Sequence, residues 1–166
     1  MFLGLMSCDL GDDPEIGGTA TQAVSGEWWT TFTIDGDDVY GIGYQQITTS
    51  NTAANSTTEF LVTDVGHTWD YKVKCPLNLD ARSFGGDALQ NLVDGYDITM
   101  NIANGKVLHG AATSTGGNVT DSIYFEIEFE DDPGTVYQVA GYRRTGFLED
   151  ERSEERRVGK ECRSRW

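Results

Sequence analysis

Basic residues are scarce in this sequence, with 12 Lys and Arg against 27 Asp and Glu, so the formal net charge is −15. Binding to a nucleic acid needs a basic surface that faces the phosphates. Attachment to an anionic membrane through protein charge likewise needs clustered Lys and Arg. We therefore expect no nucleic-acid partner, and no membrane attachment through the charges of the folded domain.

Cysteine, proline and long apolar runs are also rare. The chain has three Cys and three Pro among its 166 residues, and no apolar stretch has the length of a membrane-spanning helix. Cys8 and Cys162 lie near the two ends, so Cys75 is left as the one cysteine of the central region. An internal disulfide is thereby excluded there, and no Cys/His spacing typical of zinc is present. The sequence predicts no metal site and no cofactor.

What the sequence has instead is glycine, aromatic residues and alternation. It contains 20 Gly and 11% aromatic residues, which is typical of a turn-rich β protein with one domain. In residues 69–77 and 123–130, apolar and polar side chains alternate with a period of two. Such a pattern indicates strands of an antiparallel sheet that has one buried face and one solvated face.

Turn residues separate these runs. Asn104-Gly105 predicts a tight hairpin, because both residues readily adopt the positive φ of a type I′ turn. A short helical turn is expected over 88–93. The predicted strands are 27–34, 39–48, 58–65, 68–77, 95–103, 106–113, 119–130 and 135–145. About eight strands in sequential hairpins favour an all-β, antiparallel up-and-down barrel, since closure removes exposed sheet edges.

The last fifteen residues, 152–166, differ in composition from the rest of the chain. They contain six of the twelve Lys and Arg residues and read RSEERRVGKECRSRW. This string resembles a translated sequencing adapter, whose first codons, AGATCGGAAGAG, encode Arg-Ser-Glu-Glu. We expect residues 152–166 to be a non-native tail, and Cys162 to carry no chemistry of the protein.

The other end resembles the start of a bacterial lipoprotein. Residues 5–8 read LMSC, which is similar to a lipobox, and the acidic, Gly-rich stretch DLGDDPEIGG follows. We expect residues 1–8 to be a truncated signal peptide with Cys8 lipidated, and residues 9–25 to be a flexible acidic tether. Acyl chains would then supply the membrane attachment, and residues 26–151 would form the barrel domain.

Several segments resemble one known family. They are GEWW at 26–29, NTAANSTTEF at 51–60, WDYKVK at 69–74 and GYRRTGFLEDE at 141–151. These segments are similar to a Bacteroidetes family of lipoproteins, described as lipid-binding putative hydrolases. The resemblance implies a calycin-like barrel in the bacterial cell envelope, attached to the outer membrane. Exposure of the domain on the cell surface is one alternative for its orientation.

A second similarity concerns how calycin barrels close. Lipocalin-like barrels begin with Gly-x-Trp and carry an Arg on the last strand that packs over the Trp. Gly26-Glu27-Trp28 matches the first part, and either Arg143 or Arg144 is placed to supply the second. The resemblance therefore implies barrel closure by Trp28 with one of these arginines, through a guanidinium–indole contact.

The residues favour binding over catalysis. Neither histidine, His67 or His109, lies in a sequence motif of a serine hydrolase or a zinc protease. We expect a lipid or small apolar molecule to bind at the mouth of the barrel. The candidate ligand-binding residues are Trp28, Phe32, Tyr44, Trp69, Tyr71 and Phe125. Two alternatives remain open, namely a hydrolase of lipids or esters and a non-catalytic accessory protein of a surface complex.

Overall fold

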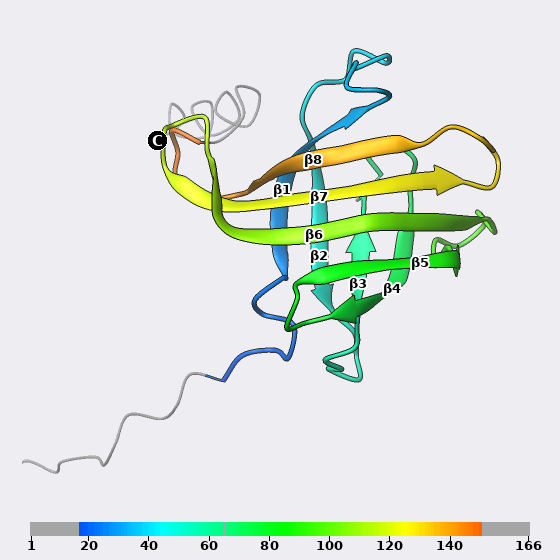
Figure 1. Ribbon diagram of the computed structural model, residues 1–166, viewed down its shortest axis with the longest axis horizontal. Helices are drawn as coiled ribbons and strands as arrows, with labels where there is room; N and C mark the ends of the chain where they lie inside the picture. Colours follow the sequence, from blue (N-terminus) through cyan, green and yellow to red (C-terminus); the bar gives the residue numbers. More distant parts are fainter. Residues whose placement is uncertain (1–16, 65, 151–166) are drawn as a thin grey trace, which may run out of the picture.

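Eight antiparallel strands form a closed barrel in the computed structural model, which describes residues 17–64 and 66–150. Each strand pairs with the next along the chain, and β8 pairs with β1 (Figure 1). The strands are β1 (Gly26–Thr33), β2 (Gln45–Asn51), β3 (Glu59–Thr63), β4 (Lys72–Asn78), β5 (Ser83–Gln90), β6 (Thr99–Thr113), β7 (Val119–Phe129) and β8 (Tyr137–Arg143). The expected up-and-down barrel is confirmed.

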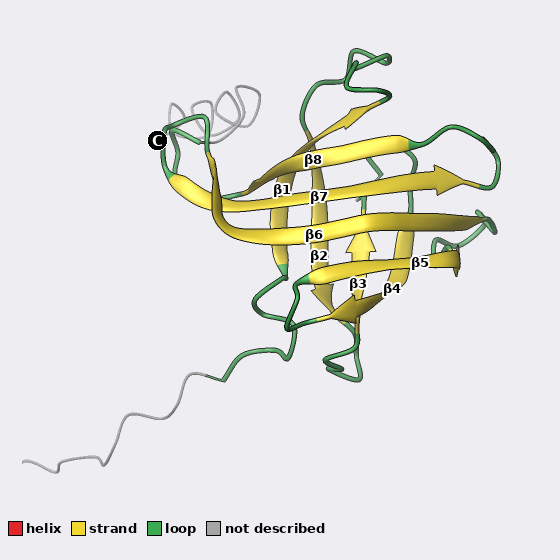
Figure 2. Cartoon of the chain, viewed as in Figure 1, coloured by secondary structure: helices red, strands yellow, loops and turns green. Residues whose placement is uncertain are grey.

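The described residues contain strands and loops but no helix (Figure 2). Accordingly, none of them forms a helix with the length and apolar character needed to cross a bilayer. In Figure 1, β5 to β8 run across the direction of β1 to β4, as strands on opposite walls of a tilted barrel do.

The alternation seen in the sequence decides which side chains fill the barrel. Along β7, Ile123, Phe125 and Ile127 are buried and alternate with the partly exposed Tyr124 and Glu126. The same period of two recurs in β4, where Val73, Cys75 and Leu77 are the buried residues. Successive side chains point to opposite faces of a strand, so one face of each strand supplies the core.

The hairpin prediction at Asn104-Gly105 was wrong. The two predicted strands, 95–103 and 106–113, are parts of the single strand β6, which continues through a bulge between Ala103 and Lys106. Asn104 does have a positive φ of 55°, so the backbone geometry that the Asn-Gly pair favours is used for a bulge and not for a chain reversal. A Cβ at Gly105 would overlap the carbonyl oxygen and ring of Phe84.

The helical turn expected over 88–93 was also wrong. Residues 83–90 form β5, which pairs with β6 through two register shifts. Phe84 is the only residue of this strand that is fully buried. Because most of its other side chains are only partly covered, the strand lacks the alternation that identifies the other strands. The number of strands is still eight, because the unpredicted strand β5 makes up for the two predicted strands that form the single strand β6.

Several boundaries also differ from expectation. β4 begins at Lys72, whereas we expected a strand from residue 68, so Trp69 and Tyr71 precede the strand. Residues 34–44 form a loop, and β2 begins at Gln45, whereas we expected a strand from residue 39. Within the segment 9–25, expected as a flexible tether, residues 20–24 form a turn in which Thr21 and Val24 are completely buried. The end of the expected tether therefore packs against the barrel.

Side chains fill the barrel interior. Trp28, Phe60, Phe125 and Phe129 are each 0% exposed and form part of one continuous hydrophobic cluster. An eight-stranded barrel is just wide enough for side chains or one small ligand. Here the side chains occupy that space, so any ligand site must lie near an end of the barrel or on its surface.

Candidate functional site

A small, largely apolar cavity of about 240 Å³ lies at the end of the barrel where β1 finishes. We call it the mouth pocket. One strand and two loops form it: Phe32 comes from β1, two residues come from the β1–β2 loop, and three come from the β3–β4 loop. Its lining residues are Phe32, Tyr40, Ile42, His67, Thr68 and Trp69.

Asp38 organises the β1–β2 loop. Its carboxylate accepts hydrogen bonds from the backbone N–H groups of Ile42, at 3.2 Å, and Gly43, at 2.7 Å. Gly41 and Gly43 have φ values of 64° and 63°, which glycine adopts without steric cost. These contacts hold Ile42 beside the pocket.

Asp64 plays the corresponding part in the β3–β4 loop. It is 0% exposed and accepts hydrogen bonds from the backbone N–H and the hydroxyl of Thr68, both at 2.7 Å. The N–H of Asp70 donates to the same carboxylate at 3.2 Å. These hydrogen bonds compensate for burial of the charge and fix the turn that carries Trp69.

Stacked aromatic rings form the floor of the mouth pocket. The rings of Trp69 and Phe129 stack with centroids 4.8 Å apart, and those of Phe32 and Tyr137 stack at 4.5 Å. Phe32 and Phe129 are also neighbours, at 6.4 Å. The pocket is therefore closed off from the rest of the barrel by residues that belong to its core.

Carboxylates and hydroxyl groups surround these rings. Trp69 donates its indole N–H to Asp131 at 3.3 Å, and Tyr96 donates its hydroxyl to the same carboxylate at 2.5 Å. The Tyr137 hydroxyl donates to Asp132 at 2.5 Å and lies 3.0 Å from the Tyr40 hydroxyl. Burial and the nearby carboxylate raise the pKa of Tyr137, so this hydroxyl stays protonated as a donor.

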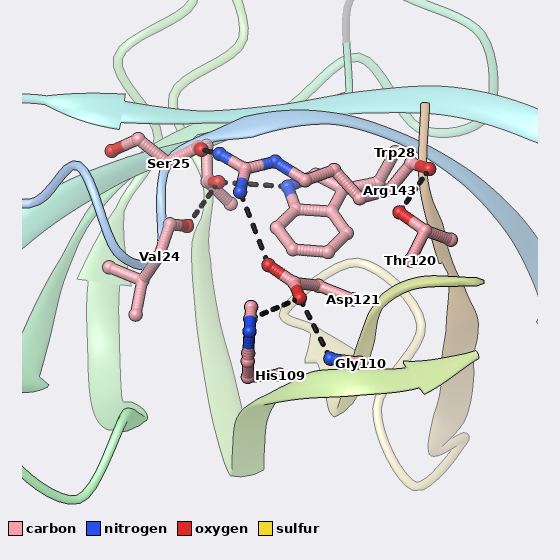
Figure 3. A network of polar contacts seen from close by, with 9 residues as sticks. Val24, Ser25, Trp28, His109, Gly110, Thr120, Asp121 and Arg143 are labelled. Carbon is pink, nitrogen blue, oxygen red and sulfur yellow. Dashed lines mark hydrogen bonds and ion pairs between the residues drawn. The ribbon is translucent and has the colours of Figure 1, made fainter. Parts of the chain in front are cut away.

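The opposite end of the barrel is closed by a polar network around Trp28 (Figure 3). The guanidinium carbon of Arg143 lies 5.7 Å from the centre of the Trp28 ring, and Arg143 also donates to the carbonyl of Ser25. The indole N–H of Trp28 donates to Thr49 at 2.9 Å. Arg144 pairs instead with Glu27 at 2.8 Å, so Arg143 is the arginine that meets Trp28.

Asp121 connects this network to β6. Its carboxylate lies 3.2 Å from Arg143 Nη1, 2.8 Å from His109 Nδ1 and 2.9 Å from the N–H of Gly110. Burial alone would raise the pKa of Asp121, but the Gly110 hydrogen bond and the charges of His109 and Arg143 outweigh it and lower the pKa. Asp121 is therefore ionised at neutral pH.

A known protein family matches most of the chain. Residues 13–148 match the family described as lipid-binding putative hydrolase. The chain belongs to this family. No curated protein matches the sequence.

The ligand-binding residues predicted for this lipid-binding family member separate into three places. Phe32 and Trp69 line the mouth pocket. Trp28, Tyr71 and Phe125 are at most 1% exposed and belong to the core. Tyr44 packs against Tyr142, with ring centroids 5.7 Å apart, and is not part of the pocket lining.

Four lining residues were not among the predicted ligand-binding residues, namely Tyr40, Ile42, His67 and Thr68. The two carboxylates that hold the loops, Asp38 and Asp64, were missed as well. Their positions offered one signal, since an Asp followed by Gly or Thr a few residues later is typical of loops whose backbone N–H groups bond to a side chain. That pattern predicts a turn. It does not predict that two such turns meet.

Neither histidine is placed as part of a nucleophilic pair. His67 Nδ1 donates to the carbonyl of Gln46 at 3.0 Å, and His109 contacts Asp121. Across residues 17–64 and 66–150, no serine, threonine or cysteine side chain hydrogen-bonds to either ring, and no three metal-binding side chains converge. The expected lipidation site, Cys8, and the expected tail, 152–166, lie outside the described residues.

Proposed function

We propose that this protein binds a lipid or another small apolar molecule through the mouth pocket. The observation that carries the proposal is an aromatic and aliphatic cavity that two hydrogen-bonded loops hold above a filled barrel. Lipid-binding family membership supports the same class of ligand. Binding, rather than hydrolysis, is proposed because no serine, threonine or cysteine side chain hydrogen-bonds to His67 or His109 in the described part of the chain.

The size of the pocket limits what can enter it. Sites for drug-sized ligands usually measure about 300–1,000 Å³, whereas the mouth pocket measures about 240 Å³. It would therefore take the end of one acyl chain or a small apolar molecule, with the remainder of a larger ligand outside. Asp131 and Asp132 lie beside the pocket floor, so an anionic polar end would stay outside the pocket, away from these carboxylates, with only the acyl chain inside.

We further propose that the protein acts at the bacterial cell envelope, as a lipoprotein anchored at the outer membrane through Cys8. The lipobox-like LMSC at residues 5–8 and the acidic stretch after it support this location. Metabolic labelling with a fatty-acid analogue, in cells that express the chain behind a restored signal peptide, tests the anchor. Labelling that persists in Cys8→Ala would contradict it.

Quenching of tryptophan fluorescence by a brominated fatty acid tests the pocket. Trp69 lines the cavity, so we expect saturable quenching that is largely lost in Trp69→Phe. Ile42→Glu should weaken binding by at least about tenfold, because it introduces a charge into an apolar site. Val39→Glu is the matched control, since Val39 lies in the same loop, is 54% exposed and is absent from the lining.

Native mass spectrometry of the purified chain provides an independent measurement, because a retained lipid would appear as a mass adduct. Equal affinities for the wild type and Ile42→Glu would show that the fatty acid binds elsewhere. Absence of both quenching and adduct across fatty acids of different chain length would overturn the proposed function.

A further inference from the structure

A second cavity, of about 520 Å³, lies at the opposite, closed end of the barrel. It gathers residues from separate parts of the chain: the turn before β1, the β4–β5 turn, and strands β6, β7 and β8. We call it the closed-end cavity. Its lining residues are Ala20, Gln22, Ala23, Arg82, His109, Asp121 and Arg143.

This cavity concentrates positive charge in an acidic protein. Residues 17–150 contain six Lys and Arg against 19 Asp and Glu, yet two of the six, Arg82 and Arg143, line this one cavity beside a histidine. Asp121 is the only carboxylate in the lining. The charged side chains of the cavity lining therefore sum to a positive charge, whereas those of residues 17–150 sum to a negative one.

Asp121 offsets the charge of Arg143 but not that of Arg82. Arg143 and Asp121 form an ion pair at 3.2 Å. The guanidinium of Arg82 makes no hydrogen bond or ion pair with any residue that the structure describes. With Arg143 and Asp121 neutralising each other, Arg82 leaves the cavity with one net positive charge.

His109 adds a further polar group. Its side chain is 78% exposed and its Nδ1 is held by Asp121 at 2.8 Å, so the other ring nitrogen remains open to a ligand. When protonated, that nitrogen is a donor. Gln22 contributes an amide to the same lining. Donors thus come from the turn before β1, the β4–β5 turn and two strands.

We propose that the closed-end cavity binds a phosphate group, carried either by a small molecule or by a lipid headgroup, with Arg82 as the principal donor. The planar fork of an arginine matches two oxygens of a phosphate, and the remaining oxygens can meet Gln22, His109 and the unused N–H groups of Arg143. Overall negative charge does not prevent this, because repulsion from distant carboxylates is screened beyond about 8 Å at physiological ionic strength.

This site is separate from the mouth pocket. Trp28, at the start of β1, lies beside Arg143, whereas Phe32, near the end of the same strand, lines the mouth pocket. If phosphate does not bind to the closed-end cavity, the proposal for the mouth pocket is unaffected. If no apolar ligand binds to the mouth pocket, the phosphate proposal is likewise unaffected.

Titration of the full chain with inorganic phosphate, followed by NMR at constant ionic strength, tests the proposal. We expect saturable shifts of the Arg82 and His109 side-chain signals. Arg82→Gln should weaken phosphate binding about tenfold, as expected for loss of a charge-assisted hydrogen bond, and His109→Gln should weaken it less. Lys74→Gln, which removes the same charge outside the cavity, should bind as the wild type does.

Equal phosphate affinities for Arg82→Gln and the wild type would overturn the proposal, as would the absence of saturable binding. Co-sedimentation with vesicles of phosphatidylcholine containing about 30% phosphatidylglycerol distinguishes the two sources of phosphate. Vesicle binding that Arg82→Gln reduces points to a headgroup, while phosphate binding without vesicle binding points to a small molecule. Unchanged quenching by the brominated fatty acid in Arg82→Gln would show that the two sites are independent.

Discussion

At the scale of single residues, Arg143 connects several parts of the barrel. It contacts the Trp28 ring, the Asp121 carboxylate and the Ser25 carbonyl, and so links β1, β7 and the turn before β1. Its neighbour Arg144 makes a pair with Glu27, which is 50% exposed. Arg143 is the last residue of β8 and Arg144 follows it directly. Because successive residues of an extended chain point to opposite faces, the two arginines meet different partners.

Arg143→Gln should therefore lower the free energy of unfolding by about 1–3 kcal/mol, since it removes the contact with the indole and the ionic partner of a nearly buried carboxylate. Arg144→Gln should lower it by less than about 1 kcal/mol, as exposed ion pairs contribute little. Urea denaturation followed by circular dichroism measures both. Equal losses for the two variants would contradict the closing role of Arg143.

The sequence could narrow the closing arginine to these two positions but could not choose between them. The choice depends on the register between β1 and β8, in which Trp28 lies opposite Arg143. A shift of one residue would have exchanged the two side chains. Register is decided by the packing of the whole barrel, so a local motif does not reveal it.

At the scale of elements, the bulge in β6 shows how a tight-turn signal can serve another purpose. The positive φ of Asn104 and the close approach of Phe84 to Gly105 explain why this pair of residues occurs there. A hairpin and a bulge need similar backbone conformations. What differs is the partner strand: β5 and β7 flank β6 on both sides of Asn104-Gly105, and neither pairing is visible in the local sequence.

Gly105→Ala should destabilise the barrel by about 1–3 kcal/mol, the usual cost of forcing an extra carbon into a packed position, because the new Cβ would overlap Phe84. Asn104→Gly is the comparison, since it preserves the positive φ and loses only an exposed hydrogen bond to Glu126. Thermal unfolding of both variants provides the measurement. A Gly105→Ala protein as stable as Asn104→Gly would show that Phe84 can move aside at little cost.

At the scale of the whole molecule, alternation and turn residues were sufficient to predict a closed barrel, but not how full it is. The same aromatic residues could line a cavity or pack against one another. Their packing depends on contacts between distant strands, such as Phe32 with Phe129 and Tyr137. The mouth pocket likewise depends on two loops, held by Asp38 and Asp64, that are far apart in the sequence.

Acid should destabilise this barrel through Asp150, which ties the segment after β8 to the β6–β7 loop. Asp150 accepts hydrogen bonds from Gly116, Asn118 and Thr145. Burial opposes ionisation, but the hydrogen bonds from these residues and Ser114 lower the pKa of Asp150 to about 2, from an ordinary value of 3.8. Because the folded state favours the ionised form, this stabilisation is complete above pH about 4 and is lost as the pH falls towards 2.

Asp150→Asn should consequently reduce stability at pH 7 and also flatten the dependence of stability on pH between about 4 and 2. Asp80→Asn is the matched control, because the Asp80 carboxylate makes no hydrogen bond to any described residue. Urea unfolding at a series of pH values, with ionic strength held constant, separates this effect from the general relief of repulsion as other carboxylates become neutral. If the unfolding free energy of Asp150→Asn depended on pH as steeply as that of the wild type in this range, the acid sensitivity would have to come from other carboxylates. Asp121, whose pKa is also lowered, would then be the next residue to replace.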